Sequence, residues 1–224
     1  MSIAENLKKV KSKLDEGVEL VAVSKTKPAS AIEEAYAEGQ RIFGENRPKE
    51  MQEKAEALPK DIEWHMIGHL QSKKTKYIAP FVSLIHSVDK LSLLQEINKR
   101  AIQNDRVIDV LLQVYIAKEE SKFGMDEDEV LELLNSAEFK KLTNVRVVGL
   151  MGMATNTDDE NIVKSEFKGL KTFFDSVKNS AVSTPIDLTN FTIVSMGMSG
   201  DYKIAMEEGS NMVRIGSSIF GSRS

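Results

Sequence analysis

The sequence has no cysteine among its 224 residues, which excludes disulfide bonds, thiolate metal sites and a cysteine nucleophile. It also has no dense run of lysine and arginine. Because the formal net charge is -4, the composition argues against a nucleic-acid-binding protein.

Long hydrophobic runs are absent as well. No apolar stretch approaches the roughly 20 residues that a bilayer-spanning helix needs. Residues 1–17 form an amphipathic pattern with charges throughout, unlike a signal peptide. We therefore expect a cytosolic protein that meets no membrane, and a monomer, because no exposed apolar stripe stands out.

What the sequence does contain is a regular alternation of short apolar runs and longer amphipathic ones. The predicted strands are 18–24, 41–45, 63–68, 83–88, 107–116, 145–151, 191–197 and 211–217. The predicted helices between them are 28–39, 47–57, 72–79, 90–104, 126–141, 160–179 and 200–209.

Strict alternation predicts a parallel sheet with helical crossovers. Eight strands favour a closed (β/α)8 TIM-type barrel, and an open sheet with one or two miscounted strands is the alternative. We expect one domain over 1–224, with an N-terminal helix at about 2–16 and no linker.

In such barrels the working site lies where the strands end at their carboxyl side. Two loops there are rich in glycine and serine, SMGMSGD (195–201) and RIGSSIFG (214–221). Backbone N–H groups and hydroxyls at Ser199 and Ser217 suit a phosphate, and loops after strands seven and eight are its usual place in this fold. The alternative is that both serines are ordinary helix N-caps.

Two basic side chains are expected beside these loops. Arg214 lies in an apolar strand and projects to the same side as Gly216, so it needs an acceptor, either a rim carboxylate or a ligand ring atom. Lys25 ends the run VELVAVS, and barrel closure brings the first strand next to the eighth. Proximity to Arg214 and partial desolvation should lower the pKa of Lys25 and favour a nucleophilic amine.

A lysine amine, a phosphate cradle and a ring donor together describe a pyridoxal 5'-phosphate site with a Schiff base at Lys25. Lys27 is the competing lysine. It lies outside the apolar run, so we expect its amine to be solvated.

The ordered motifs AVSKTKP, FGEN, WHMIGHLQSKK, SKFG, GLMGMA, SMGMSGD and VRIGSSIFG resemble the pyridoxal phosphate homeostasis proteins over about residues 18–221. The resemblance implies the barrel of alanine racemase, the fold-type III architecture. It implies these roles for the site residues: Lys25 for the Schiff base, Ser199, Gly200, Gly216 and Ser217 for the phosphate, Arg214 for the pyridine nitrogen, and Asn46 near the ring. Where many relatives read LQSNK this chain has Lys73, which leaves any role of that asparagine in doubt.

The resemblance also implies a cofactor carrier in vitamin B6 homeostasis, with pyridoxal phosphate-dependent apoenzymes as possible partners, rather than an enzyme. The alternative is an amino-acid racemase, which needs a second acid/base group. In alanine racemase-like enzymes that group comes from a further domain, and we expect none in this chain. The internal candidates are Tyr115, Tyr202, His65 and His86.

A metal-dependent hydrolase is the rival from another class, because His65, His69, His86 and Asp89 lie near the ends of the third and fourth strands. Gly68 should end the strand and scatter this set, so we expect no metal site. Lys122, in SKFG, is a candidate way-station for cofactor transfer, and the basic run 72–76 reads as a solvated helix start.

Overall fold

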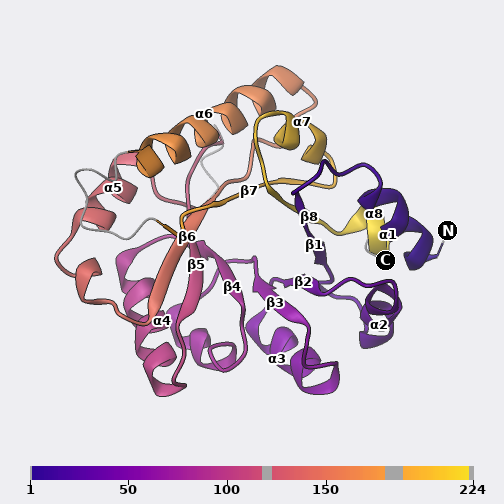
Figure 1. The fold of residues 1–224 in the computed structure, drawn as a ribbon, viewed down its shortest axis with the longest axis horizontal. Helices are drawn as coiled ribbons and strands as arrows, with labels where there is room; N and C mark the ends of the chain where they lie inside the picture. Colours follow the sequence, from indigo (N-terminus) through magenta and orange to yellow (C-terminus); the bar gives the residue numbers. More distant parts are fainter. Residues whose placement is uncertain (1, 118–122, 180–188, 222–224) are drawn as a thin grey trace.

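The computed structural model describes residues 2–117, 123–179 and 189–221, and it confirms the closed barrel. Neighbouring strands are parallel and follow chain order, and β1 closes the ring against β8. The helices lie outside the strands, and the two chain ends lie close together (Figure 1). The alternative of an open sheet is therefore wrong.

The observed elements match the predicted ones with trimmed ends. The strands are β1 (Glu19–Val23), β2 (Ile42–Glu45), β3 (Glu63–Met66), β4 (Leu84–Val88), β5 (Ile108–Gln113), β6 (Val145–Met151), β7 (Ile193–Met198) and β8 (Met212–Ile215). The α-helices are α1 (Ile3–Lys11), α2 (Ala29–Ala37), α3 (Pro48–Ala57), α4 (Leu91–Gln103), α5 (Glu127–Asn135), α6 (Glu160–Asn179), α7 (Tyr202–Glu207) and α8 (Ser217–Phe220).

Three helix predictions were wrong in extent or type. The N-terminal helix ends at Lys11 rather than near residue 16. Directly after Lys11, the Ser12 hydroxyl donates to the Lys9 carbonyl in the last turn. Within the predicted helix 72–79, the structure has a 3-10 helix, η1 (Ser72–Tyr77), and Pro80 follows too closely for an α-helix to continue.

The predicted helix 126–141 is broken at Ser136. Its hydroxyl donates to the Leu133 carbonyl and accepts from the Phe139 N–H, so the side chain replaces the helical backbone bonds. A short 3-10 helix, η2 (Phe139–Lys141), takes the place of the last turn.

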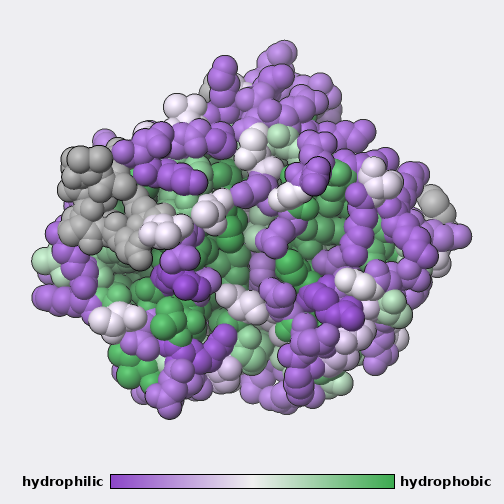
Figure 2. All heavy atoms as spheres, in the orientation of Figure 1, coloured by the Kyte–Doolittle hydropathy of each residue, from purple (hydrophilic) through white to green (hydrophobic). Residues whose placement is uncertain are grey.

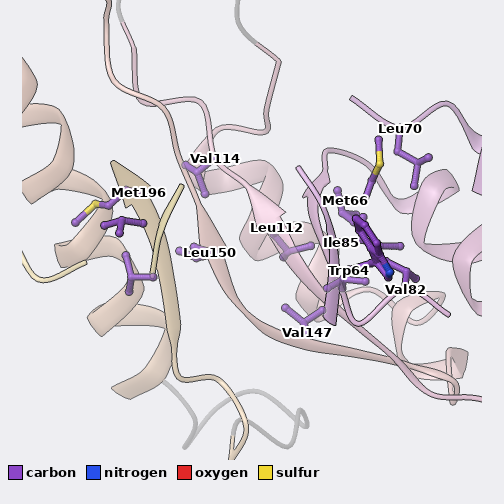
Figure 3. Close-up of a cluster of buried hydrophobic side chains, with 14 of the residues drawn as sticks. Trp64, Met66, Leu70, Val82, Ile85, Leu112, Val114, Val147, Leu150 and Met196 are labelled. Atoms are coloured by element: carbon purple, nitrogen blue, oxygen red, sulfur yellow. The ribbon is translucent and has the colours of Figure 1, made fainter. Parts of the chain in front are cut away.

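Alternation along each strand divides the apolar residues into two sets. One set fills the barrel interior and includes Val21, Leu111 and Met212. The larger set packs between the strands and the surrounding helices; Figure 3 shows part of it, with Trp64 and Ile85 close together on neighbouring strands. Odd-numbered residues of β1 therefore face the barrel and even-numbered ones face the helices, which decides where Lys25 points.

The outer face follows the usual pattern for a water-exposed protein. Hydrophilic residues cover most of the face in Figure 2, and hydrophobic residues show between them towards its middle. Within the described ranges, no helix is both long and apolar enough to cross a membrane.

Candidate functional site

All seven predicted site residues line one cavity of about 330 Å³ at the carboxyl end of the strands. Ligand cavities start at roughly this size. The polar lining consists of Lys25, Lys27, Asn46, Ser199, Arg214 and Ser217 together with the glycines Gly200, Gly216 and Gly221. No carboxylate is among the lining residues that the structure describes, so the cavity is cationic and suits an anion.

Strand pairing brings the two ends of the chain to this cavity. Val21 of β1 lies opposite Arg214 of β8, as barrel closure predicts. Val23 and Lys25 continue the inward-facing row past the end of β1 and line the cavity. Lys27 lines it too, so this residue is part of the cavity wall.

Arg214 is almost fully buried, with a relative exposure of 4%. Its guanidinium donates to Ser195 Oγ at 2.6 Å and to the Gly152 carbonyl at 3.1 Å. Burial lowers the pKa of Arg214 to about 10, against an upward influence of Asp201, so the group stays charged at neutral pH. Two fixed donors leave the rest of the planar guanidinium to face the cavity.

A buried chain of hydrogen bonds continues from Arg214 into the barrel. Ser195 Oγ lies 3.0 Å from His86 Nδ1, and His86 Nε2 lies 3.1 Å from His65 Nδ1. Burial lowers the pKa of His65 to about 3 and that of His86 well below its usual value, so both rings are neutral. Since Arg214 only donates, we assign the Ser195 hydroxyl hydrogen to His86 Nδ1, which makes His86 Nε2 the donor to His65.

The two glycine-serine loops meet at the cavity. Ser199 Oγ accepts the Gly216 N–H at 3.3 Å and so links the loop after β7 to the loop after β8. The alternative that both serines are N-caps is wrong, because Asp201 precedes α7 and Gly216 precedes α8. Among the described residues, the N–H groups of Ser217 and Ser218 have no protein acceptor.

Glycines shape this end of the barrel in two ways. A Cβ at Gly200 would meet nothing within 4 Å, so this glycine leaves open space beside the loop hydroxyls. A Cβ at Gly68 would come within 2.7 Å of the Asn46 backbone, so the loop after β3 approaches Asn46 closely only because Gly68 has no side chain.

Four residues raised the alternative of a metal site, and no group of three or more potential metal ligands exists among the described residues. His65 and His86 lie inside the barrel, whereas His69 is at the surface, 3.5 Å from Asp89. The four residues therefore form two separate pairs, His65 with His86 and His69 with Asp89. The ring of His69 stacks on Phe123.

Several other candidates lie away from the cavity. Tyr115, Tyr202, His65 and His86 are not among its lining residues, and neither is Lys73, which is exposed. Lys122 lies outside the described residues.

Sequence reasoning missed the apolar lining and the support of Arg214. Ile67, Met153 and Met198 form apolar walls of the cavity. Ser195 and His86 each sit in an apolar strand on the face that points inward, and period-two register with Arg214 would have indicated both.

Comparison with known proteins agrees with this geometry. A family model described as "Alanine racemase, N-terminal domain" matches residues 1–224. A pyridoxal phosphate homeostasis protein of Vibrio alginolyticus is 41% identical over 213 residues, which cover 93% of this chain and 88% of the relative. This chain belongs to the pyridoxal phosphate homeostasis protein family.

Solved structures of this family and of its wider fold are similar to the chain. PipY of Synechococcus elongatus PCC7942, solved with pyridoxal phosphate bound, is 36% identical with a TM-score of 0.86 and covers 98% of this chain and 100% of PipY. Alanine racemase of Clostridium difficile 630 has a TM-score of 0.78 at 16% identity, which shows a shared barrel fold. This chain covers 57% of that racemase.

Proposed function

We propose that this pyridoxal phosphate homeostasis protein binds pyridoxal 5'-phosphate as a Schiff base on Lys25 and acts in cofactor homeostasis and supply, without a dedicated reaction. The observation that carries the proposal is the convergence of an amine, a buried guanidinium and two hydroxyl-bearing loops on one cavity. PipY, the relative solved with pyridoxal phosphate, supports the choice of ligand.

The residues of the cavity fit this group. Lys25 supplies the amine for the aldehyde. Ser199, Ser217 and the unpaired N–H groups after Gly216 supply phosphate donors, and the space beside Gly200 accommodates the phosphate oxygens. Arg214 is held where it can donate to the pyridine nitrogen, and Asn46 lines the same cavity. When bound, pyridoxal phosphate supplies an electrophilic carbon that captures amines.

Arg214 also argues against catalysis. Burial leaves this guanidinium with a pKa of about 10, so at neutral pH it donates a hydrogen bond and keeps its protons. A ring nitrogen that faces such a donor stays unprotonated, which weakens the ring as an electron sink. Among the lining residues, Lys27 is the single side chain besides Lys25 with a titratable amine, and none of the four proposed racemase bases is present.

The relatives support the same reading, since they are named as homeostasis proteins. Supply implies that pyridoxal phosphate-dependent apoenzymes are recipients. We also propose that the protein is monomeric and cytosolic. Residues 1–224 form one cofactor-binding domain in this proposal.

The proposal is tested by titrating the cofactor-free protein with pyridoxal phosphate and recording the visible absorbance of the Schiff base. We expect a saturable yellow species in the wild type and none in Lys25→Ala. Lys27→Ala is the matched control and should keep the yellow species. A wild type that stays colourless, or a Lys25→Ala protein that colours like the wild type, would contradict the proposal.

A further inference from the structure

The end of β1 makes a tight turn at Lys25. The Lys27 N–H donates to the Ser24 carbonyl at 3.0 Å, which closes a four-residue turn. Its third residue, Thr26, has a φ of 65°. Glycine or asparagine is usual there, and a β-branched residue with positive φ is a backbone outlier. Something outside the turn must therefore hold this conformation.

Strand alternation places different partners on the two sides of this turn. Lys25 faces the cavity, whereas Ser24 is fully buried on the side that faces the helices. There it contacts Glu45 at the end of β2 and Lys54 of α3, and Lys54 in turn bonds Glu50, one helical turn earlier in α3.

These three side chains bond the residues on either side of Lys25. Lys54 Nζ donates to the Ser24 carbonyl at 2.9 Å and to Glu45 Oε1 and Glu50 Oε1 at 2.7 Å each. Glu45 Oε1 accepts the Ser24 hydroxyl at 2.6 Å. Glu50 Oε1 accepts the Thr26 N–H at 2.6 Å.

The arrangement is costly for stability alone. Glu45 is fully buried and Lys54 is 8% exposed, and Glu45 Oε2 has no hydrogen-bond partner in the described part of the chain. Buried ion pairs often stabilise a fold no better than apolar residues of the same size, so their position needs another reason. The bonds are concentrated on the two neighbours of one cavity-facing lysine.

We infer that Glu45, Glu50 and Lys54 form a backbone clamp that positions the Lys25 amine in the cavity. They are positioning residues, because they act through Ser24 and Thr26. The inference rests on the proposed function, since it assigns the clamp to the amine that takes the cofactor. Amine placement matters because a shift of about 1 Å can reduce a reaction rate or binding step by about a hundredfold.

Glu50 offers the sharpest test, because it is partly exposed and holds Thr26 through one oxygen. Glu50→Ala removes the acceptor, whereas Glu50→Gln keeps an oxygen at the same place. With full-length protein, we expect Glu50→Ala to weaken pyridoxal phosphate binding by roughly ten- to a hundredfold and Glu50→Gln to restore most of it. Inorganic phosphate should compete with pyridoxal phosphate for the loops after β7 and β8. We expect this competition to be equally strong in the wild type, Glu50→Ala and Glu50→Gln.

Three results would overturn the clamp: wild-type affinity in Glu50→Ala, an equal loss in Glu50→Gln, or a parallel loss of phosphate competition. Hydrogen exchange at the Thr26 amide gives a readout that needs no cofactor. We expect faster exchange in Glu50→Ala than in the wild type, and an unchanged rate also overturns the clamp. A wild type that takes up no pyridoxal phosphate refutes the proposed function, and the Thr26 exchange rate then judges the clamp by itself.

Discussion

At the scale of single residues, Arg214 is a buried cation with two fixed acceptors. It lines the cavity, and its guanidinium donates to a serine hydroxyl and to a carbonyl, with two neutral histidines behind the serine. Each ring nitrogen of His86 has a partner, so the rest of the barrel fixes the direction of the guanidinium. This row of hydrogen bonds therefore presents the guanidinium to the cavity in one direction.

The neutrality of His65 has a consequence for stability. An unfolded histidine takes up a proton near pH 6.5, whereas folded His65 does so only at about 3. Between these values the unfolded chain binds more protons, so stability is lost as the pH falls through this window. His65 should contribute a slope of up to about 1.4 kcal/mol per pH unit.

We therefore expect His65→Asn to flatten the pH dependence of unfolding by up to one proton between about pH 6 and about pH 4. Asparagine keeps an acceptor near the Nδ1 position, so the bond with His86 can persist. Urea unfolding at several pH values measures the slope. A variant with the slope of the wild type would show that His65 is not held neutral.

At the scale of elements, the end of β7 and the loop into α7 contain two glycines with different roles, Gly197 in the strand and Gly200 in the loop. Gly197 has a φ of 95°, and a Cβ there would come within 2.6 Å of the Ala205 side chain. Gly200 has open space around its Cβ position. One glycine allows the turn, and the other leaves room beside it.

The substitutions should separate accordingly. Gly197→Ala should destabilise the protein by about 2 kcal/mol or more, because left-handed strain and the contact with α7 add. Gly200→Ala should change stability by less than about 0.5 kcal/mol but weaken pyridoxal phosphate binding, because its methyl group enters the cavity. Thermal unfolding without cofactor and absorbance titration measure the two effects. Tight binding in Gly200→Ala would show that the phosphate lies elsewhere.

Some of the elements and their arrangement could be predicted from the sequence, and others could not. The β-α alternation, the pairing of β1 with β8 and the convergence of Lys25, Arg214 and the two loops all followed from periodicity and barrel closure. The type of η1 and the break at Ser136 did not, because a nearby proline and one serine hydroxyl decide them locally.

Long-range polar contacts were the second gap. The bond of Glu50 to Thr26 joins residues 24 positions apart, and that of His86 to Ser195 joins residues 109 positions apart. Nothing in the local pattern marks such partners, although the inward register of each strand does limit them.

At the scale of the whole molecule, the barrel brings the beginning and end of the chain together. Asn6 of α1 donates to the Ile219 carbonyl of α8, so the N-terminal helix supports the short helix that begins at Ser217. The cavity thus depends on closure of the entire ring.

The activity of the whole protein distinguishes a cofactor carrier from a racemase. With the cofactor bound, a racemase would exchange the α-hydrogen of an amino acid such as L-alanine with solvent. In heavy water we expect no exchange by the loaded protein beyond that of free pyridoxal phosphate, because the described cavity lining lacks the proposed second bases. Exchange that is fast in the wild type and lost in Lys27→Ala would instead indicate a two-lysine racemase. Proton NMR of the amino acid follows the reaction.

The central claim is that Lys25 carries the cofactor, and peptide mapping after reduction tests it most directly. Borohydride reduces a Schiff base to a stable amine, so the modified lysine can be found by mass spectrometry of the digested protein. We expect the pyridoxyl group on Lys25, with Lys27 unmodified. A label on Lys27, or a label spread over surface lysines, would contradict the account.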